Sequence, residues 1–207
     1  MEINNIFCIG RNYKDHATEL GNAVPERPLV FSKPTHSLVK ADGSVLEYPD
    51  DRGDIHHEIE VVLYIGNEVE ENFKVDDIVT KMALGVDFTL RDVQSGLKKK
   101  GPPWLLAKGF QNAAVITDFW EFPGVEKSKE VDFSLERDGE TVQKGNIGQV
   151  IFDFQTILEY VHQHFGLGKG DIIYTGTPEG VSAISDREKY VLHWGDEAKG
   201  SFVVSKS

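Results

Sequence analysis

The sequence lacks the features that are typical of secreted and membrane proteins. A single cysteine, Cys8, occurs among 207 residues, which excludes an intramolecular disulfide. Cys8 lies in the apolar stretch 6–9, so we expect a buried and unreactive thiol. No apolar run reaches the ~20 residues that a membrane-spanning helix needs. The first residues lack a basic segment followed by an apolar one, so we expect no signal peptide and a cytoplasmic protein.

Positive charge is also scarce. The chain has 22 Lys and Arg against 34 Asp and Glu, a formal net charge of −12. This balance disfavours nucleic acid and anionic membrane surfaces as partners. The one basic cluster, residues 98–100, precedes Gly101, and we interpret it as a solvated helix end rather than a binding patch.

The composition otherwise suits one globular domain spanning residues 1–207, with 40% hydrophobic and 27% charged residues. We expect strands at 6–9, 28–32, 83–90, 113–119, 171–174 and 202–204, and a hairpin at 133–142 that turns at Asp138-Gly139. We expect helices at 13–20 (capped by Asn12), from Asp76 through Met82, at 91–99, and after Asp153 with an apolar stripe ending at Phe165. Strands outnumber helices, which predicts an α+β fold, mainly β, with mixed or antiparallel strands and a few short helices.

Two glutamates stand at the start of the apolar run 61–65, which we predict to be a strand. Side chains two residues apart on a strand share a face, so Glu58 and Glu60 should point the same way. Two adjacent carboxylates at a buried strand repel each other unless they are neutralised, and a divalent cation with oxygen ligands would do so. The alternative is a frayed strand end with two solvated glutamates, which is the commoner meaning of an isolated Glu-x-Glu pattern.

Two further charges lie in apolar segments. Asp87 either makes a local side-chain-to-backbone hydrogen bond or joins Glu58 and Glu60 as a third ligand. Three carboxylates without cysteine suit a hard ion such as Mg²⁺ or Mn²⁺. Lys108, within residues 104–110, could hold an anionic substrate, or it could extend its amine to solvent from a half-buried strand.

Five motifs along the chain together resemble the fumarylacetoacetate hydrolase family, over nearly the whole length and closest to its compact members. The motifs are Arg11-Asn12-Tyr13-x-x-His16-x-x-Glu19, His57-Glu58-x-Glu60, Asp87-x-Thr89-x-Arg91-Asp92-x-Gln94, Trp104-x-x-Ala107-Lys108 and Thr175-Gly176-Thr177-Pro178-x-Gly180. The resemblance implies a barrel-like β-roll of mixed strands, a homodimer, and no extra N-terminal domain. Residues 185–194 depart from the family pattern, and we expect at most an altered loop at the rim of the site.

The resemblance also implies the site residues. They are the metal ligands Glu58, Glu60 and Asp87 for Mg²⁺ or Mn²⁺, the water-activating pair His16 and Glu19, the substrate contacts Lys108 and Thr177, the pocket residue Gln94, and Arg11 toward the substrate carboxylate. His16 and Glu19 would lie on a mobile lid, residues 10–27, that closes over the metal.

The implied activity is metal-dependent hydrolysis of the C–C bond of 2,4-dioxo acids, such as acylpyruvates and fumarylpyruvate, through a metal-bound pyruvate enolate. The alternative is an oxaloacetate decarboxylase or tautomerase, or a 2-hydroxyhepta-2,4-diene-1,7-dioate isomerase, which needs the same enolate but no attacking water. A non-enzymatic carboxylate-binding module would leave His16, Glu19 and Lys108 without a role. The identity of the acyl group and the choice between the two metals stay open.

Overall fold

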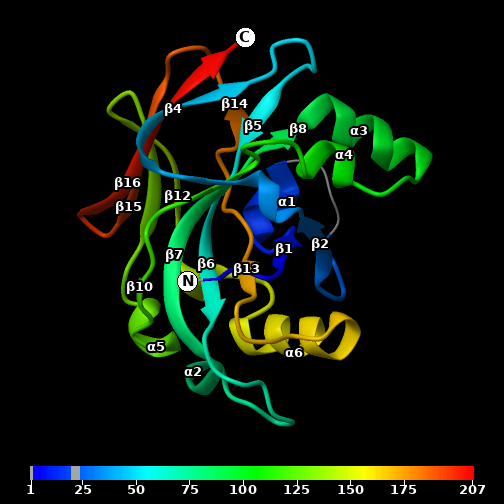
Figure 1. Cartoon of the computed structure of the whole chain (residues 1–207), viewed down its shortest axis with the longest axis vertical. Helices are drawn as coiled ribbons and strands as arrows, with labels where there is room; N and C mark the ends of the chain where they lie inside the picture. Colours follow the sequence, from blue (N-terminus) through cyan, green and yellow to red (C-terminus); the bar gives the residue numbers. More distant parts are fainter. Residues whose placement is uncertain (1, 20–23) are drawn as a thin grey trace.

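Strands dominate the part of the chain that this computed structural model describes, residues 2–19 and 24–207 (Figure 1). The largest sheet has eight strands. In spatial order they are β2 (Leu29–Lys33), β1 (Ile6–Gly10), β13 (Ile172–Tyr174), β6 (Ile59–Ile65), β7 (Val79–Asp87), β9 (Ala114–Ile116) and β3 (Leu38–Lys40), with β10 (Trp120–Glu121) also pairing with β7. The pairs β1–β13 and β3–β9 are parallel and the others are antiparallel, so the sheet is mixed.

Two smaller sheets complete the β structure. One contains β12 (Glu140–Gly145), β11 (Phe133–Arg137), β15 (Lys189–Trp194), β16 (Glu197–Lys206) and β4 (Asp42–Tyr48), in that order. The other contains β14 (Ser182–Ala183), β5 (Ile55–His57) and β8 (Thr89–Leu90). The strands curl, as β7 shows most clearly in Figure 1. The predicted fold class, mainly β with mixed strands, is confirmed.

The helices are short and lie around the sheets. They are α1 (Lys14–Glu19), α2 (Val75–Ile78), α3 (Arg91–Lys100), α4 (Leu105–Lys108), α5 (Val125–Ser128) and α6 (Phe154–Phe165), with single 3₁₀ turns at Thr35–Ser37 and Ile147–Gln149. None of the helices in the described residues is both long and apolar enough to cross a membrane.

Strand β6 is buried on both faces, and this determines where its charged residue goes. Its alternate residues Ile59, Val61, Leu63 and Ile65 pack in one apolar cluster, as predicted, and all are fully buried. The intervening residues face a second cluster on the other side of the sheet. Glu60 belongs to that second face, so the strand carries its carboxylate into the interior.

Local sequence signals predicted several elements correctly. The hairpin of β11 and β12 turns at Asp138 and Gly139, both with positive φ (51° and 88°), which suits a two-residue turn. The side chain of Asp153 caps α6 by accepting a hydrogen bond from the Thr156 N–H at 2.8 Å. Helix α3 extends one residue beyond the predicted 91–99.

Other predictions were wrong. The helix from Asp76 through Met82 stops at Ile78, because the chain from Val79 onward pairs with β6 along nearly its whole length. Strand pairing here overrides the local helical pattern. Phe165 does not complete the apolar stripe of α6, since 56% of its surface is exposed.

Two segments for which no strand was predicted form strands. The polar, turn-rich stretch 45–54 overlaps β4, which pairs in parallel with β16. Residues 185–194, for which we expected at most an altered loop at the rim of the site, contain β15, a central strand of the five-stranded sheet. In both segments the strand results from pairing with neighbouring strands and not from a strong local sequence pattern.

Asn12 does not serve as the predicted helix cap. Its fully buried side chain donates to the carbonyls of Phe152 and Thr175 and accepts from the Phe152 N–H at 2.8 Å, joining β1 to distant segments. Helix α1 accordingly begins at Lys14, and position 20, the expected last residue, lies outside the described residues. The extent of the domain, the mobile lid, the homodimer and the cytoplasmic location stay predictions.

Candidate active site

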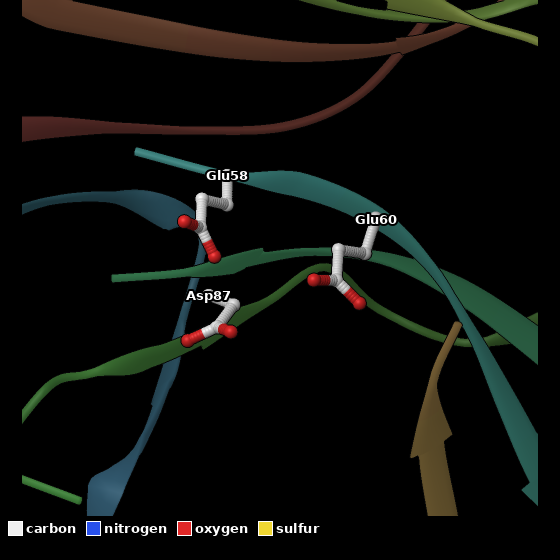
Figure 2. A group of neighbouring side chains, drawn as sticks. All are labelled: Glu58, Glu60 and Asp87. Atoms are coloured by element: carbon white, nitrogen blue, oxygen red, sulfur yellow. The ribbon is translucent and has the colours of Figure 1, made fainter. Parts of the chain in front are cut away.

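Three carboxylates meet where β6 and β7 lie side by side. Glu58 immediately precedes β6, Glu60 lies on it, and Asp87 is the last residue of β7. The Asp87 N–H donates to the Glu58 carbonyl at 2.8 Å, which fixes the two chains in register. Oxygen atoms of the three side chains lie within 4.8 Å of one another, and Figure 2 shows the carboxylates converging. All three residues are buried.

Lys108 joins two of these carboxylates. Its Nζ donates to Glu58 Oε2 at 2.7 Å, to Asp87 Oδ2 at 2.6 Å and to Thr89 Oγ1 at 2.6 Å. Burial alone would lower the pKa of this amine, but Asp87 and Glu58 outweigh burial and raise it. Lys108 is therefore a firmly protonated cation whose three N–H donors are all used, so a substrate contact requires one of these bonds to be exchanged.

Two more cations compensate the acids. Lys33, at the end of β2, pairs with Asp87 Oδ1 at 2.7 Å and donates to the Phe88 carbonyl at 3.2 Å. Arg91 pairs with Glu58 Oε1. Burial would raise the pKa of Glu58, but Lys108 and Arg91 hold it well below its usual range. The chain's own cations therefore neutralise two of the three acids, so the sequence argument that a metal is needed to do so was incomplete.

Glu60 is different because it has no cationic partner in the described residues. Its Oε2 accepts only the Gly176 N–H, at 2.7 Å. Gly176 has a φ of +104° and lies against Asn12, where an added Cβ would come within 2.6 Å of another carbon, so glycine is required there. Burial, and then the charge of Asp87, raise the pKa of Glu60 well above its usual range.

This donor set fits a divalent cation. Glu60 supplies an uncompensated oxygen, and Glu58 and Asp87 retain lone pairs beside their lysine and arginine contacts. An all-oxygen set without cysteine suits a hard ion of the Mg²⁺ or Mn²⁺ type. The ligand role of the three acids stays a prediction. We refer to Glu58, Glu60, Asp87, Lys33 and Lys108 as the acidic centre.

A small cavity opens onto the acidic centre. Its lining includes the three acids and Lys108, together with Arg11, His16, Arg91, Gln94, Lys98 and Thr177. Of the nine residues predicted for the site, the structure places all but Glu19 on this lining. The aromatic rings of Phe31 and Trp104 complete one side of it.

His16 and Glu19 come together on α1. His16 Nδ1 lies 3.5 Å from Glu19 Oε2, too far for a strong hydrogen bond, and both oxygens of Glu19 instead face the Gly180 N–H at 3.2 and 3.3 Å. Burial lowers the pKa of His16, which keeps the imidazole neutral and able to accept a proton. Catalytic hydrogen bonds are often loose without substrate, so this spacing is compatible with a base and its orienting acid. We refer to Arg11, His16, Glu19 and Lys98 as the outer group.

The two polar pocket residues are held by neighbours. Thr177 Oγ1 accepts from Gln143 Nε2 at 2.9 Å, which leaves its O–H free to donate into the cavity. Gln94 accepts from Arg91 Nη1 at 2.9 Å.

Sequence reasoning missed three residues. Lys33 is a charge in an apolar segment, and the reasoning applied to Lys108 would have found it. Gln143, buried on β12, accepts from the Ile59 N–H at 3.0 Å and has no local signal. Residues 98–100 form the exposed end of α3 before Gly101, as predicted, but Lys98 also lines the cavity.

The family description "Fumarylacetoacetate (FAA) hydrolase C-terminal" matches residues 5–202. The chain belongs to the fumarylacetoacetate hydrolase family. This confirms the resemblance that the five motifs indicated. Two named members of the family are close to it in length. "Oxaloacetate tautomerase fahd-1, mitochondrial" of Caenorhabditis elegans is 35% identical over 96% of this chain and 94% of its own. "Oxaloacetate decarboxylase, mitochondrial" of Dictyostelium discoideum is 37% identical over 86% and 83%.

A solved structure of the fumarylacetoacetate hydrolase family is also similar. The crystal structure of fumarylpyruvate hydrolase from Pseudomonas aeruginosa, in complex with Mn²⁺ and pyruvate, superposes with a TM-score of 0.90 at 32% identity. The match covers 99% of this chain and 91% of that one. Members of the family are thus enzymes acting on small carboxylic acids, and one of similar fold binds a divalent metal.

Proposed function

We propose that the chain is a divalent-metal-dependent enzyme that interconverts the keto and enol forms of oxaloacetate and can also decarboxylate it. The observation that carries this proposal is the meeting of three buried carboxylates at a cavity that cationic side chains also line. The names of the curated relatives support it. These names favour the second expectation from the sequence, an oxaloacetate tautomerase or decarboxylase. They give less support to the first expectation, acylpyruvate hydrolysis.

Glu58, Glu60 and Asp87 would hold the ion, Mg²⁺ or Mn²⁺. When bound, such an ion polarises the 2-oxo group of a substrate and so makes the neighbouring C3–H bond more acidic.

The chain's own residues then supply the proton transfers. In tautomerisation a proton leaves C3, and the electron pair of the broken C3–H bond forms the C2–C3 double bond. The oxygen on C2 gains a proton. His16, neutral and on the cavity lining, is the base that takes the C3 proton. Lys108, held protonated, stabilises the negative charge that develops on the oxygen, and the free O–H of Thr177 donates to the substrate carboxylate.

Decarboxylation uses the same charge stabilisation. The C3–C4 bond breaks, CO₂ leaves, and the electron pair of that bond becomes the C2–C3 double bond. Protonation of C3 then gives pyruvate. This route needs no base to start it.

A second candidate is hydrolysis of a 2,4-dioxo acid such as fumarylpyruvate. The proximity of His16 and Glu19 favours it, because an oriented imidazole can deprotonate a water that attacks C4. Hydrolysis then breaks the C3–C4 bond and yields pyruvate and a second acid.

A substrate panel with chelator-treated protein tests the proposal. Oxaloacetate, acetylpyruvate and fumarylpyruvate would be assayed without metal and after addition of Mg²⁺ or Mn²⁺. We expect no turnover without metal, restoration by either ion, and the highest kcat/KM with oxaloacetate. Full activity in metal-free buffer would contradict metal dependence, and a higher kcat/KM with fumarylpyruvate would favour the second candidate.

A further inference from the structure

The outer part of the cavity carries positive charge that the protein does not compensate. Lys98 and Arg11 both line it. In residues 2–19 and 24–207, neither forms an ion pair with a carboxylate, whereas Lys33, Arg91 and Lys108 each do. The Nε of Arg11 is buried and has no hydrogen-bond partner among the described residues. Both cations are therefore free to bind an anion that enters the cavity.

Helix α3 places Lys98 by its periodicity. Arg91, Gln94 and Lys98 follow one another at spacings of three and four residues, so they share one face of the helix. All three line the cavity. Lys98 Nζ also lies 5.3 Å from the ring centroid of Trp104, a cation–π contact that holds the amine beside the opening.

The two unpaired cations line the same cavity, and the charge of Arg11 acts on Lys98. Partial burial of its amine, and then the positive charges of Arg11 and Arg91, lower the pKa of Lys98 to about 8, although the side chain as a whole is exposed. Like charges brought together in this way are unfavourable until an anion lies between them. The proposed function already places the carboxylate next to the 2-oxo group at the acidic centre and Thr177.

We propose that Lys98, together with Arg11, binds the second carboxylate of the substrate and so selects 2-oxo dicarboxylates over 2-oxo monocarboxylates. This inference rests on the proposed function for the position of the 2-oxo acid end. It excludes acylpyruvates with an apolar acyl group as good substrates, while oxaloacetate and fumarylpyruvate both carry the required second charge.

A matched pair of unreactive ligands tests this without turnover. N-oxalylglycine carries two carboxylates, and N-ethyloxamate has a methyl group in place of the second one. Calorimetry with the Mn²⁺-loaded protein should show roughly tenfold tighter binding of N-oxalylglycine, the factor expected for one charged hydrogen bond. Lys98→Gln should remove this preference by weakening N-oxalylglycine alone, and Lys98→Arg should retain most of it.

The control is Lys99→Gln, which makes the same charge change one residue away at an exposed position outside the cavity lining. It should leave both affinities unchanged. Equal affinity of the unmodified protein for the two ligands would overturn the proposal. So would a Lys98→Gln variant that weakens both ligands alike, or a Lys99→Gln variant that behaves as Lys98→Gln does. If the preference is present and depends on Lys98 but oxaloacetate is not turned over, the proposed function fails and the proposed carboxylate site stands.

Discussion

The acidic centre and the outer group both contribute side chains to one cavity but are built in different ways. The acidic centre is buried throughout and tied together by ion pairs of 2.6–2.7 Å between strands and the short helix α4. In the outer group only His16 is buried, and its members come from the end of β1 and from the helices α1 and α3. In the proposed reactions, the acidic centre stabilises the enolate that all of them share, whereas the outer group moves protons, activates water and contacts the far end of the substrate.

The strongest test of this separation concerns Glu19. If the outer group activates water, Glu19→Ala should lower hydrolysis of a 2,4-dioxo acid by roughly 10²–10⁴, the loss expected for general-base catalysis. Oxaloacetate decarboxylation should fall much less, because it needs no activated water. Both rates would be measured on one preparation with the same metal. Equal losses would contradict the separation, and an unchanged hydrolysis rate would remove Glu19 from the mechanism.

Substitutions in the acidic centre should also change the free energy of unfolding, whereas substitutions in the outer group should not. Asp87→Asn breaks ion pairs to two buried lysines, so we expect the metal-free protein to lose about 3–5 kcal/mol in its free energy of unfolding. Urea denaturation measures this. The matched control is Asp118→Asn, since Asp118 pairs with Lys40 on the surface and should show no measurable change. Equal stability of the two variants would mean that the Asp87 pairs contribute nothing net.

Within the acidic centre, a substitution of Glu60 should weaken metal binding without changing the stability of the metal-free protein. Its raised pKa favours a neutral carboxylic acid in the metal-free protein, and the Glu60→Gln variant keeps a neutral group of similar shape there. We expect Mn²⁺ affinity to fall by at least about 10–100-fold. The unfolding free energy of the metal-free protein should change by less than about 1 kcal/mol. Unchanged Mn²⁺ binding in calorimetry would exclude Glu60 as a ligand.

The smallest expected effect concerns pH. The pKa of Lys98 is lowered to about 8 by burial and by Arg11, Arg91 and Lys108, with Glu58 opposing them. Only the protonated amine attracts an anion, so preference for the dianionic ligand should be complete below pH 7 and decline, by up to about tenfold, as pH rises through 8 to 9. Calorimetry at several pH values measures it, and Lys98→Arg should flatten the profile. A preference that grows with pH would contradict the assignment.

Features that depend only on neighbouring residues could be predicted from the amino-acid sequence. Alternation along β6 sets which side chains share a face, the Asp138-Gly139 pair sets a hairpin turn, and Asp153 caps α6. The five motifs identified the family, and with it eight of the residues that line the cavity. These features need only a local period, a local conformational preference or a pattern of residue types.

Which charged side chains meet depends on how distant parts of the folded chain pack together. The compensation of Asp87 by Lys33 joins β7 to β2, and the support of Ile59 and Thr177 by Gln143 joins β12 to two other segments. Strands β4 and β15 likewise exist because of their partners. Buried ion pairs and strand pairing join residues far apart in the chain, and their energies depend on distance and burial, which no local pattern records.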